Sequence, residues 1–198
     1  VQFFAWLGQV AQGDFGRSLR TGEPVLNLIL QKLPVTIQLA TASILVAICI
    51  GIPIGILAAR RKGTVVDYSA SAVALSGLSI PNFWFGIMLI LLVSVHLKWL
   101  PASGYESIFE HPWEAIKRLI MPAFVLGNGL AAFLMRHTRS AMLEVLRTDY
   151  IRTARAKGLD ERKVVNKHAL ANALVPIITL STLLFGELLA GAVLTEQI

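Results

Sequence analysis

The sequence predicts an all-α fold, namely a polytopic bundle of transmembrane helices. Of the 198 residues, 55% are hydrophobic and only 15% are charged, whereas a soluble domain usually carries about 25% charged residues. The apolar residues gather into four long blocks, each close to the ~20 residues that a helix needs to cross a bilayer. The basic residues concentrate in two of the segments between these blocks. We therefore expect one transmembrane domain over residues 1–198, with spans at about 36–59, 68–97, 119–136 and 169–195.

The first predicted span, 36–59, contains no charged residue. Gly51, Pro53 and Gly55 lie within it, and they indicate either a hinge or close helix packing, since neighbouring helices in a membrane tolerate such residues. The preceding segment 25–33 places its apolar residues on one helical face, which predicts a short helix on the membrane surface. The chain begins with Val1 and ends at Ile198 beside an apolar block, and we expect a fragment of a longer protein.

The second predicted span, 68–97, reads GLSIPNFWFG in its middle. Pro81 predicts either one kinked helix or a broken one, and the sequence leaves both open. The third span, 119–136, contains the apolar block between Arg118 and Arg136 and has Pro122 in its first turn, where a missing N–H costs little. The fourth, 169–195, carries Pro176 early and Glu187 within it.

The basic residues predict the orientation. Twelve of the eighteen Lys and Arg residues lie in the segments 60–67 and 136–168. Because basic residues keep loops on the cytoplasmic side, these two segments should be cytoplasmic. The net charge of +6 therefore reflects membrane topology, and we expect no nucleic-acid partner because no recognisable nucleic-acid-binding module accompanies it.

The segment 137–168 is too long and too regular for a simple connection. Leu143, Leu146, Tyr150 and Ala154 recur at helical spacing on one face, which predicts an amphipathic helix. Gly158 can end that helix in the left-handed conformation. Asp160 then follows as a candidate N-cap for a second helix. The pattern predicts a helix, a glycine turn and a helix on the cytoplasmic face.

At these residues the chain resembles a known family. The stretch TRSAMLEVLRTDYIRTARAKGLDERKV (138–164) is similar to the membrane-spanning permease subunit of ATP-binding-cassette importers, specifically the dipeptide, oligopeptide and nickel branch. Further similar stretches are GDFGRSLRTGEPV (13–25), GIPIGILAA (51–59), GLSIPNFW (77–84) and WLPASG (99–104). The resemblance implies a type I importer permease fold with six spans in the intact protein, the first and last of which lie outside this chain.

The resemblance also implies a function and partners. The chain would be a transport subunit of a bacterial cytoplasmic (inner) membrane, forming half of a pathway for short peptides, nickel or related small solutes. A second homologous permease, two ATPase subunits and an external solute-binding protein would complete the importer. ATP and Mg²⁺ would be bound by the ATPase subunits, and this chain would need no cofactor. The residues expected to dock an ATPase are Ala154, Arg155, Ala156, Lys157, Gly158, Leu159, Asp160 and Glu161.

Other polar residues within the predicted spans are candidates for lining the pathway. Glu187 is the strongest, because ionisable residues at membrane depth are costly and often functional. Asn128, Ser79 and Asn82 are further candidates, although polar residues also hold helices together. An alternative hypothesis is an ion-coupled secondary transporter that uses Glu187. We expect neither an enzyme nor a metal site, because the sequence contains no phosphate-binding loop and no HExxH pair.

Overall fold

The computed structural model describes residues 2–195, without the side chains of residues 2, 5 and 190–195. The chain divides into two compact units, Val1–Gln38 and Leu39–Ile198. The first unit contains helix α1, Gln2–Ala11, and a tight turn closed by an antiparallel bridge between Arg17 and Pro24. Helix α2, Val25–Arg60, then begins well before the predicted span. The segment 25–33 is thus the first part of a long helix instead of a separate surface helix.

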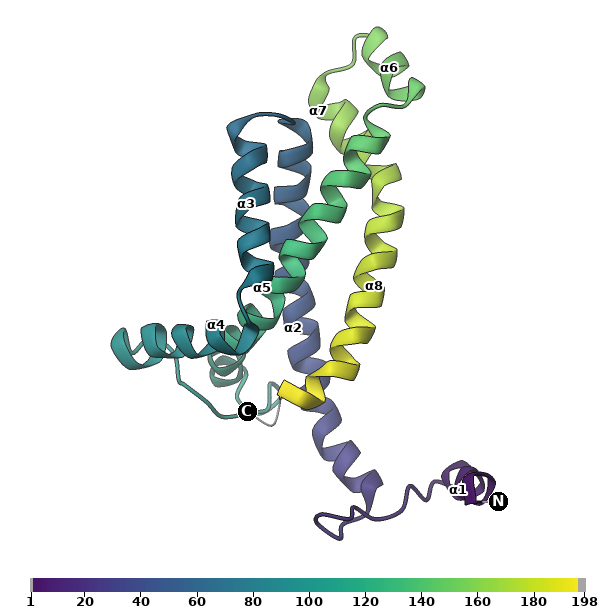
Figure 1. Cartoon of the computed structure of the whole chain (residues 1–198), viewed down its shortest axis with the longest axis vertical. Coiled ribbons are helices and arrows are strands. Elements are labelled where there is room, and N and C mark those ends of the chain that lie inside the picture. The colour runs from purple at the N-terminus through teal and green to yellow at the C-terminus, as the bar shows by residue number, and fades with distance from the viewer. Residues whose placement is uncertain (1, 196–198) are drawn as a thin grey trace. The chain divides into compact units, whose positions relative to one another are not determined.

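The second unit is an all-helical bundle, as predicted (Figure 1). Beside the later part of α2 it contains three more long helices, α3 (Val65–Ser79), α5 (Pro112–Val145) and α8 (Leu170–Thr195). Helix α5 packs against both α3 and α8. Three helices within residues 2–195 are long and apolar enough to cross a membrane, and a bent pair of helices supplies a fourth candidate span.

The bent pair lies in the second predicted span. Helix α3 ends at Ser79, and α4 (Asn82–Leu89) with the π-helical segment η1 (Ile90–His96) continues at an angle of 98°. Ile80 is extended, with ψ 123°, because the ring of Pro81 disfavours a helical conformation in the preceding residue. The broken alternative is therefore the observed one, and Figure 1 shows α4 lying across the end of the bundle.

Helices α2 and α5 approach each other very closely at glycines. A Cβ atom at Gly51 would lie 2.6 Å from the carbonyl oxygen of Ala131, and one at Gly55 would lie 2.7 Å from that of Met135. Gly127 of α5 makes the reciprocal approach to α2, where a Cβ would lie 2.8 Å from the Ser43 carbonyl oxygen. The contacts support the packing interpretation of the α2 glycines, since small residues let membrane helices touch backbone to backbone.

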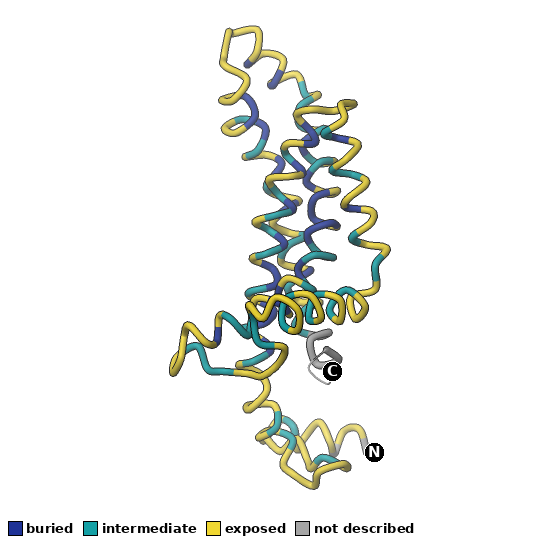
Figure 2. Tube along the Cα trace, turned by 90° about the vertical axis from the view of Figure 1, so that its left-hand side faces the viewer, coloured by how far each residue is buried: buried dark blue, intermediate teal, exposed yellow. Residues whose placement is uncertain are grey.

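Burial follows the inner faces of the long helices, as Figure 2 shows for the bundle. The outer faces carry large apolar side chains, among them Val73, Phe83, Val175 and Leu183, each more than 60% exposed. Water would oppose so much exposed apolar surface, whereas lipid tails accept it. The composition of the outer surface is that of a membrane protein.

Candidate functional site

Helix α5 is longer than the predicted third span and ends outside it, at Val145. Thr148 is extended, with ψ 155°, and its hydroxyl donates to the Val145 carbonyl. The polypeptide restarts as α6, Asp149–Ala156. The prediction of one continuous amphipathic helix from Leu143 to Ala154 is therefore wrong, because a side-chain hydrogen bond and an extended residue divide it.

The residues that follow α6 form a regular glycine-terminated turn. Gly158 has φ +76°, the left-handed conformation expected of it from the sequence. Its N–H donates to the Arg155 carbonyl at 2.9 Å, and the Leu159 N–H donates to the Ala154 carbonyl at 3.4 Å. These two bonds make a Schellman motif, which satisfies carbonyl groups that the helix end would otherwise leave unpaired.

A second helix begins immediately after the turn. The Asp160 side chain accepts a hydrogen bond from the Arg162 N–H at 3.1 Å, so Asp160 caps α7, Glu161–Lys163. Helix α7 continues through the π-helical segment η2, Val164–Ala169, into α8. We call α6, the turn and α7 (residues 149–163) the elbow.

An ion pair braces the two arms of the elbow. Arg155 of α6 donates from Nη2 to Glu161 Oε1 at 2.8 Å and from Nε to Oε2 at 3.1 Å. The Glu161 carboxylate raises the pKa of Arg155 above its usual value through this hydrogen bond. A planar two-bond contact restricts the angle between the arms more than a single point charge would. Arg155 is therefore engaged within the elbow.

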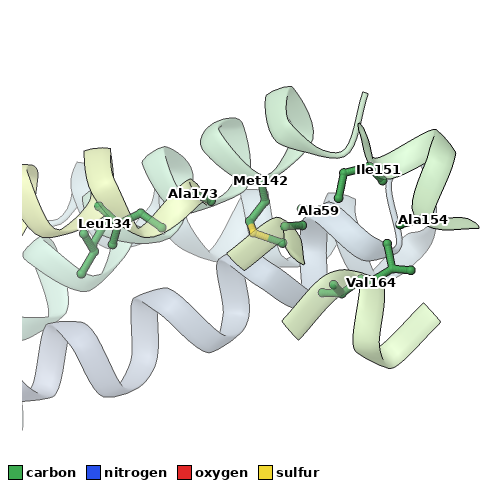
Figure 3. Packing of buried hydrophobic residues seen from close by; sticks show 10 residues of the cluster. Ala59, Leu134, Met142, Ile151, Ala154, Val164 and Ala173 are labelled. Carbon is green, nitrogen blue, oxygen red and sulfur yellow. The ribbon is translucent and has the colours of Figure 1, made fainter. Parts of the chain in front are cut away.

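The inner face of α6 and the start of η2 are packed into the helical bundle. Ile151, Val164 and Val165 are fully buried, and Ala154 is 8% exposed. They belong to one cluster with Ala59, Leu134, Met142, Ala169, Ala173 and Ile177, from α2, α5, η2 and α8 (Figure 3). Asn172 of α8 also donates to the Tyr150 hydroxyl at 2.8 Å. The elbow is thus joined to three long helices by its apolar face.

The outer face of the elbow is exposed and basic. Every residue from Arg155 to Lys163 is exposed. Arg152 pairs with Asp149 and Arg155 with Glu161, whereas Lys157, Arg162 and Lys163 make no ion pair with any described residue. The surface therefore exposes these three cationic side chains and the Leu159 side chain.

Three of the predicted pathway residues lie near the break between α3 and α4. Asn82 begins α4, and its Oδ1 lies 3.7 Å from where a Cβ of Gly129 would stand. The Asn128 amide nitrogen lies 3.4 Å from the corresponding position at Gly77. Ser79 ends α3 and donates to the Leu75 carbonyl. The fold therefore brings α3, α4 and α5 together at polar residues distant in sequence.

Glu187 lies on α8, exposed, and makes no ion pair with any described residue. No group of three His, Cys, Asp or Glu side chains within the described part of the chain is arranged to hold a metal ion.

Comparison with known proteins identifies the family. Residues 51–198 match the family described as the binding-protein-dependent transport system inner membrane component. This match includes α3, α5, the elbow and α8. The chain belongs to this family. The predicted resemblance to importer permeases of the peptide branch is confirmed, and the chain is part of a multi-pass membrane protein.

Curated relatives match the whole chain. It is 47% identical over 201 residues to the oligopeptide transport system permease protein AppB of Bacillus subtilis. It is 43% identical to the di/tripeptide transport system permease protein DppB of Pseudomonas aeruginosa and 41% identical to the dipeptide transport system permease protein DppB of Escherichia coli K12. The chain spans 64% of the length of the first relative and 65% of the other two.

Sequence reasoning missed one buried polar contact. Asp67 of α3, which is 3% exposed, forms an ion pair with Arg139 of α5. The two residues are 72 positions apart, and each alone is typical of a charged residue at the end of a span. The signal that the sequence contains is Asp67 itself, the one acidic residue in the otherwise basic segment 60–67.

Proposed function

We propose that this chain forms most of the permease subunit of an ATP-driven importer of short peptides. The family membership supplies the class of transporter, and the three relatives are permeases of oligopeptide, di/tripeptide and dipeptide systems. Their names favour peptides over nickel or related solutes as cargo. The subunit would form half of the pathway, with a second homologous permease as the other half and an external solute-binding protein delivering the substrate.

The observation that carries the proposal is the construction of the elbow. A docking element must present an exposed surface and yet be attached rigidly to the helices that it moves. Residues 155–163 are exposed, whereas Ile151, Val164 and Val165 are fully buried in the cluster shared with α2, α5 and α8. A push on the outer face would therefore be transmitted to three long helices as a unit, since a close-packed core deforms little.

Of the predicted docking residues, Ala154 is buried in the cluster beneath α6 and is placed to anchor the elbow instead of contacting a partner. The docking residues in this proposal are the exposed ones, Arg155, Ala156, Lys157, Gly158, Leu159, Asp160 and Glu161. Lys157 is the strongest candidate for a polar contact with an ATPase subunit, because it is exposed and has no described ion-pair partner. Arg155 and Glu161 would instead maintain the angle of the elbow. Leu159 would supply the apolar contact at the tip.

The mechanism that follows is alternating access. Two ATPase subunits would bind ATP and Mg²⁺ and close on each other, and the elbows would move with them. The attached helices would then open the pathway outward, and hydrolysis would reset it. This chain would contribute no group to hydrolysis, and its own parts would be the elbow, the attached helices and a lining that includes Asn82, Asn128 and Ser79.

Co-purification of the intact permease with its ATPase subunits tests the proposal. Gly158→Pro should abolish association, because proline holds φ near −65° and removes the N–H that bonds Arg155. Gly158→Asn is the matched control, since asparagine tolerates the left-handed conformation. Loss with proline and retention with asparagine would support docking at the elbow. Absence of any ATPase from the folded wild-type complex would contradict the proposal.

The alternative of ion-coupled transport through Glu187 is not favoured by the family assignment. It predicts uptake by the permease in vesicles without ATPase subunits and loss of that uptake in Glu187→Gln. Uptake of radiolabelled trialanine that needs ATP and survives Glu187→Gln would exclude it.

A further inference from the structure

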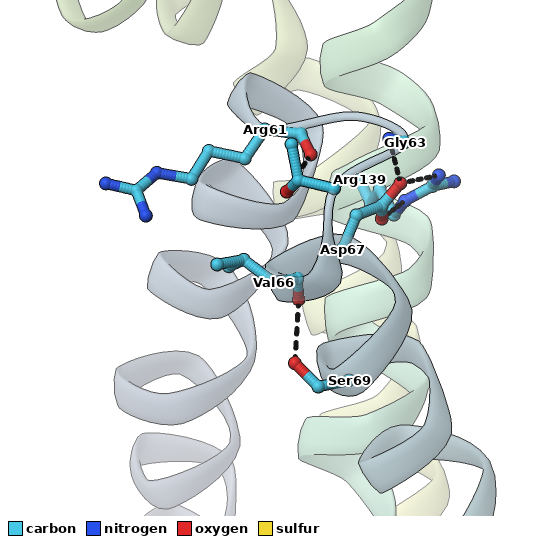
Figure 4. Close-up of polar contacts among 7 residues, drawn as sticks. Arg61, Gly63, Val66, Asp67, Ser69 and Arg139 are labelled. Carbon is cyan, nitrogen blue, oxygen red and sulfur yellow. Dashed lines mark hydrogen bonds and ion pairs between the residues drawn. The ribbon is translucent and has the colours of Figure 1, made fainter.

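The pair between Asp67 and Arg139 differs from the other ion pairs within the described residues. Like the Arg155–Glu161 pair it is bidentate, with Arg139 Nε donating to Asp67 Oδ1 at 2.5 Å and Nη2 donating to Oδ2 at 2.8 Å (Figure 4), and it differs in its burial. The Asp67 side chain is 4% exposed, whereas both partners of every other described pair are at least one-third exposed. It is also the pair that joins two long helices of the bundle.

Each of the two residues lies close to the elbow end of the bundle. Arg139 lies in the last part of α5, which leads through the turn at Thr148 into the elbow. Asp67 lies in the first turn of α3 and also accepts a hydrogen bond from the Gly63 N–H at 3.0 Å, so it organises the turn between α2 and α3. Figure 1 shows that turn and the elbow at the same end of the bundle.

Beside the ion pair, the packing between α3 and α5 uses mainly small residues, including Gly77, which faces Asn128 and Ala132. Ala70 and Ala74 of α3 pack against Ala132 and Met135 of α5. Small side chains make a smooth interface, and packed helices slide along such interfaces in shear motions. A two-bond ion pair has directional geometry that a smooth alanine contact lacks. The pair is therefore the contact that holds α3 to α5 at the elbow end.

The far end of α3 is the break at Ile80 and Pro81. Ser79 and Asn82 flank the break, and Gly77 lies beside Asn128 of α5. Helix α3 has no proline between Asp67 and the break, so a displacement at Asp67 can reach Ser79 through a continuous helix.

We propose that Asp67 and Arg139 are positioning residues that transmit elbow movement through α3 to the break beside the candidate pathway. This inference rests on the proposed function, since it requires the elbow to be moved by an ATPase. When the elbow moves α5, the ion pair carries α3 with it, and the displacement reaches Ser79 and Asn82. Without the pair, α5 slides past α3, and ATP hydrolysis continues without opening the pathway.

The test uses the intact transporter, with permease pair, ATPase subunits and external binding protein reconstituted in vesicles. The probe is radiolabelled trialanine, and the readout is peptide imported per ATP hydrolysed. Asp67→Asn should lower this ratio by at least about fivefold, the lower limit of typical coupling effects, while ATP hydrolysis per assembled complex stays within about twofold. Arg139→Lys, which retains the charge but not the two-bond fork, should give an intermediate ratio. Glu114→Gln is the control, because its ion pair with Lys117 lies within one helix.

A second measurement does not depend on the choice of peptide. With Cys49 replaced by alanine, a Ser79→Cys reporter is labelled with a maleimide in the nucleotide-free and the ATP–vanadate-trapped complexes. We expect labelling rates that differ between the two states at least about fivefold with the pair intact and do not differ in Asp67→Asn. If Asp67→Asn assembles poorly, Arg139→Lys can be used in its place. It should reduce the difference in labelling rate between the two states.

An unchanged import ratio and an unchanged labelling difference in the variants would overturn the inference. A proportional fall of hydrolysis and import with the amount of assembled complex would also overturn it, because the pair would then only stabilise the fold. A wild-type transporter that neither binds ATPase subunits nor couples hydrolysis to import would instead contradict the proposed function.

Discussion

Single residues decide the shape of the elbow. Gly158 accepts a positive φ that other residues adopt only at a cost, and Asp160 satisfies an N–H at the start of α7. Ile151 fills the core beneath α6. Gly158 and Asp160 act through the backbone, whereas Ile151 acts through packing. Substitution of Gly158 should therefore affect the turn, and substitution of Ile151 the attachment of α6 to the bundle.

Gly158→Ala should loosen the tip of the elbow and leave the bundle unchanged. The left-handed conformation costs an L-residue with a Cβ roughly 1–2 kcal/mol, which corresponds to an about 5- to 30-fold larger population of the locally open state. Amide hydrogen exchange at Gly158 and Leu159, whose N–H groups close the turn, measures the effect. Gly158→Asn should exchange more slowly than Gly158→Ala, and equal rates in all three proteins would contradict this explanation.

Ile151→Ala should detach α6 from the bundle. The side chain is fully buried, and truncation of a buried isoleucine to alanine usually costs about 2–5 kcal/mol. Limited proteolysis should therefore cleave residues 146–163 at least about tenfold faster than in the wild type, since 1.4 kcal/mol is a factor of ten. Arg152→Ala, at the exposed neighbouring position, is the control, and an equal cleavage rate in both variants would refute the packing role.

At the scale of helices, two of the contacts that α5 makes differ in kind. Helices α2 and α5 meet backbone to backbone at glycines, whereas α3 and α5 meet through alanines and one ion pair. The first contact leaves no room for a side chain larger than glycine. The second depends on a directional ion pair as well as on small side chains.

Gly55→Val should separate α2 from α5. A Cβ at this position would lie 2.7 Å from both the Met135 carbonyl oxygen and the Thr138 Cβ, and overpacking of this kind typically costs about 1–3 kcal/mol. The thermal unfolding midpoint of the intact permease in detergent should fall. Gly186→Val is the matched control because nothing lies within 4 Å of its added Cβ, and a similar fall in both variants would contradict the explanation.

At the scale of the molecule, the ends of the bundle differ in charge. The α2–α3 turn, with Arg61 and Lys62, lies at the same end as the elbow, and the segment between η1 and α5 lies at the opposite end (Figure 1). Basic residues retained on the cytoplasmic side give such an arrangement one favoured orientation.

Cysteine labelling tests that orientation. With Cys49 replaced by alanine, an impermeant maleimide should label Arg61→Cys in inverted vesicles and Ala102→Cys in intact spheroplasts, since both positions are exposed. The reverse pattern would place the elbow outside the cell and exclude its contact with cytoplasmic ATPase subunits.

The sequence by itself determined the class of fold, because apolar block length depends on bilayer thickness and not on neighbouring helices. It also determined the turn at Gly158 and the cap at Asp160, since both are local backbone effects. The resemblance over 138–164 also indicated the family, because it depends only on residues that are contiguous in the sequence.

Tertiary structure decided what distant residues do together. The pairing of Asp67 with Arg139, the approach of Gly51 and Gly55 to α5, and the burial of Ile151 each depend on two segments far apart in sequence. The sequence does not decide whether Pro81 kinks or breaks the span, because neighbouring helices can cover the freed backbone groups of a kinked span. The division at Thr148 is not visible in the sequence because helical periodicity continues through it, and only the extended backbone there separates α5 from α6.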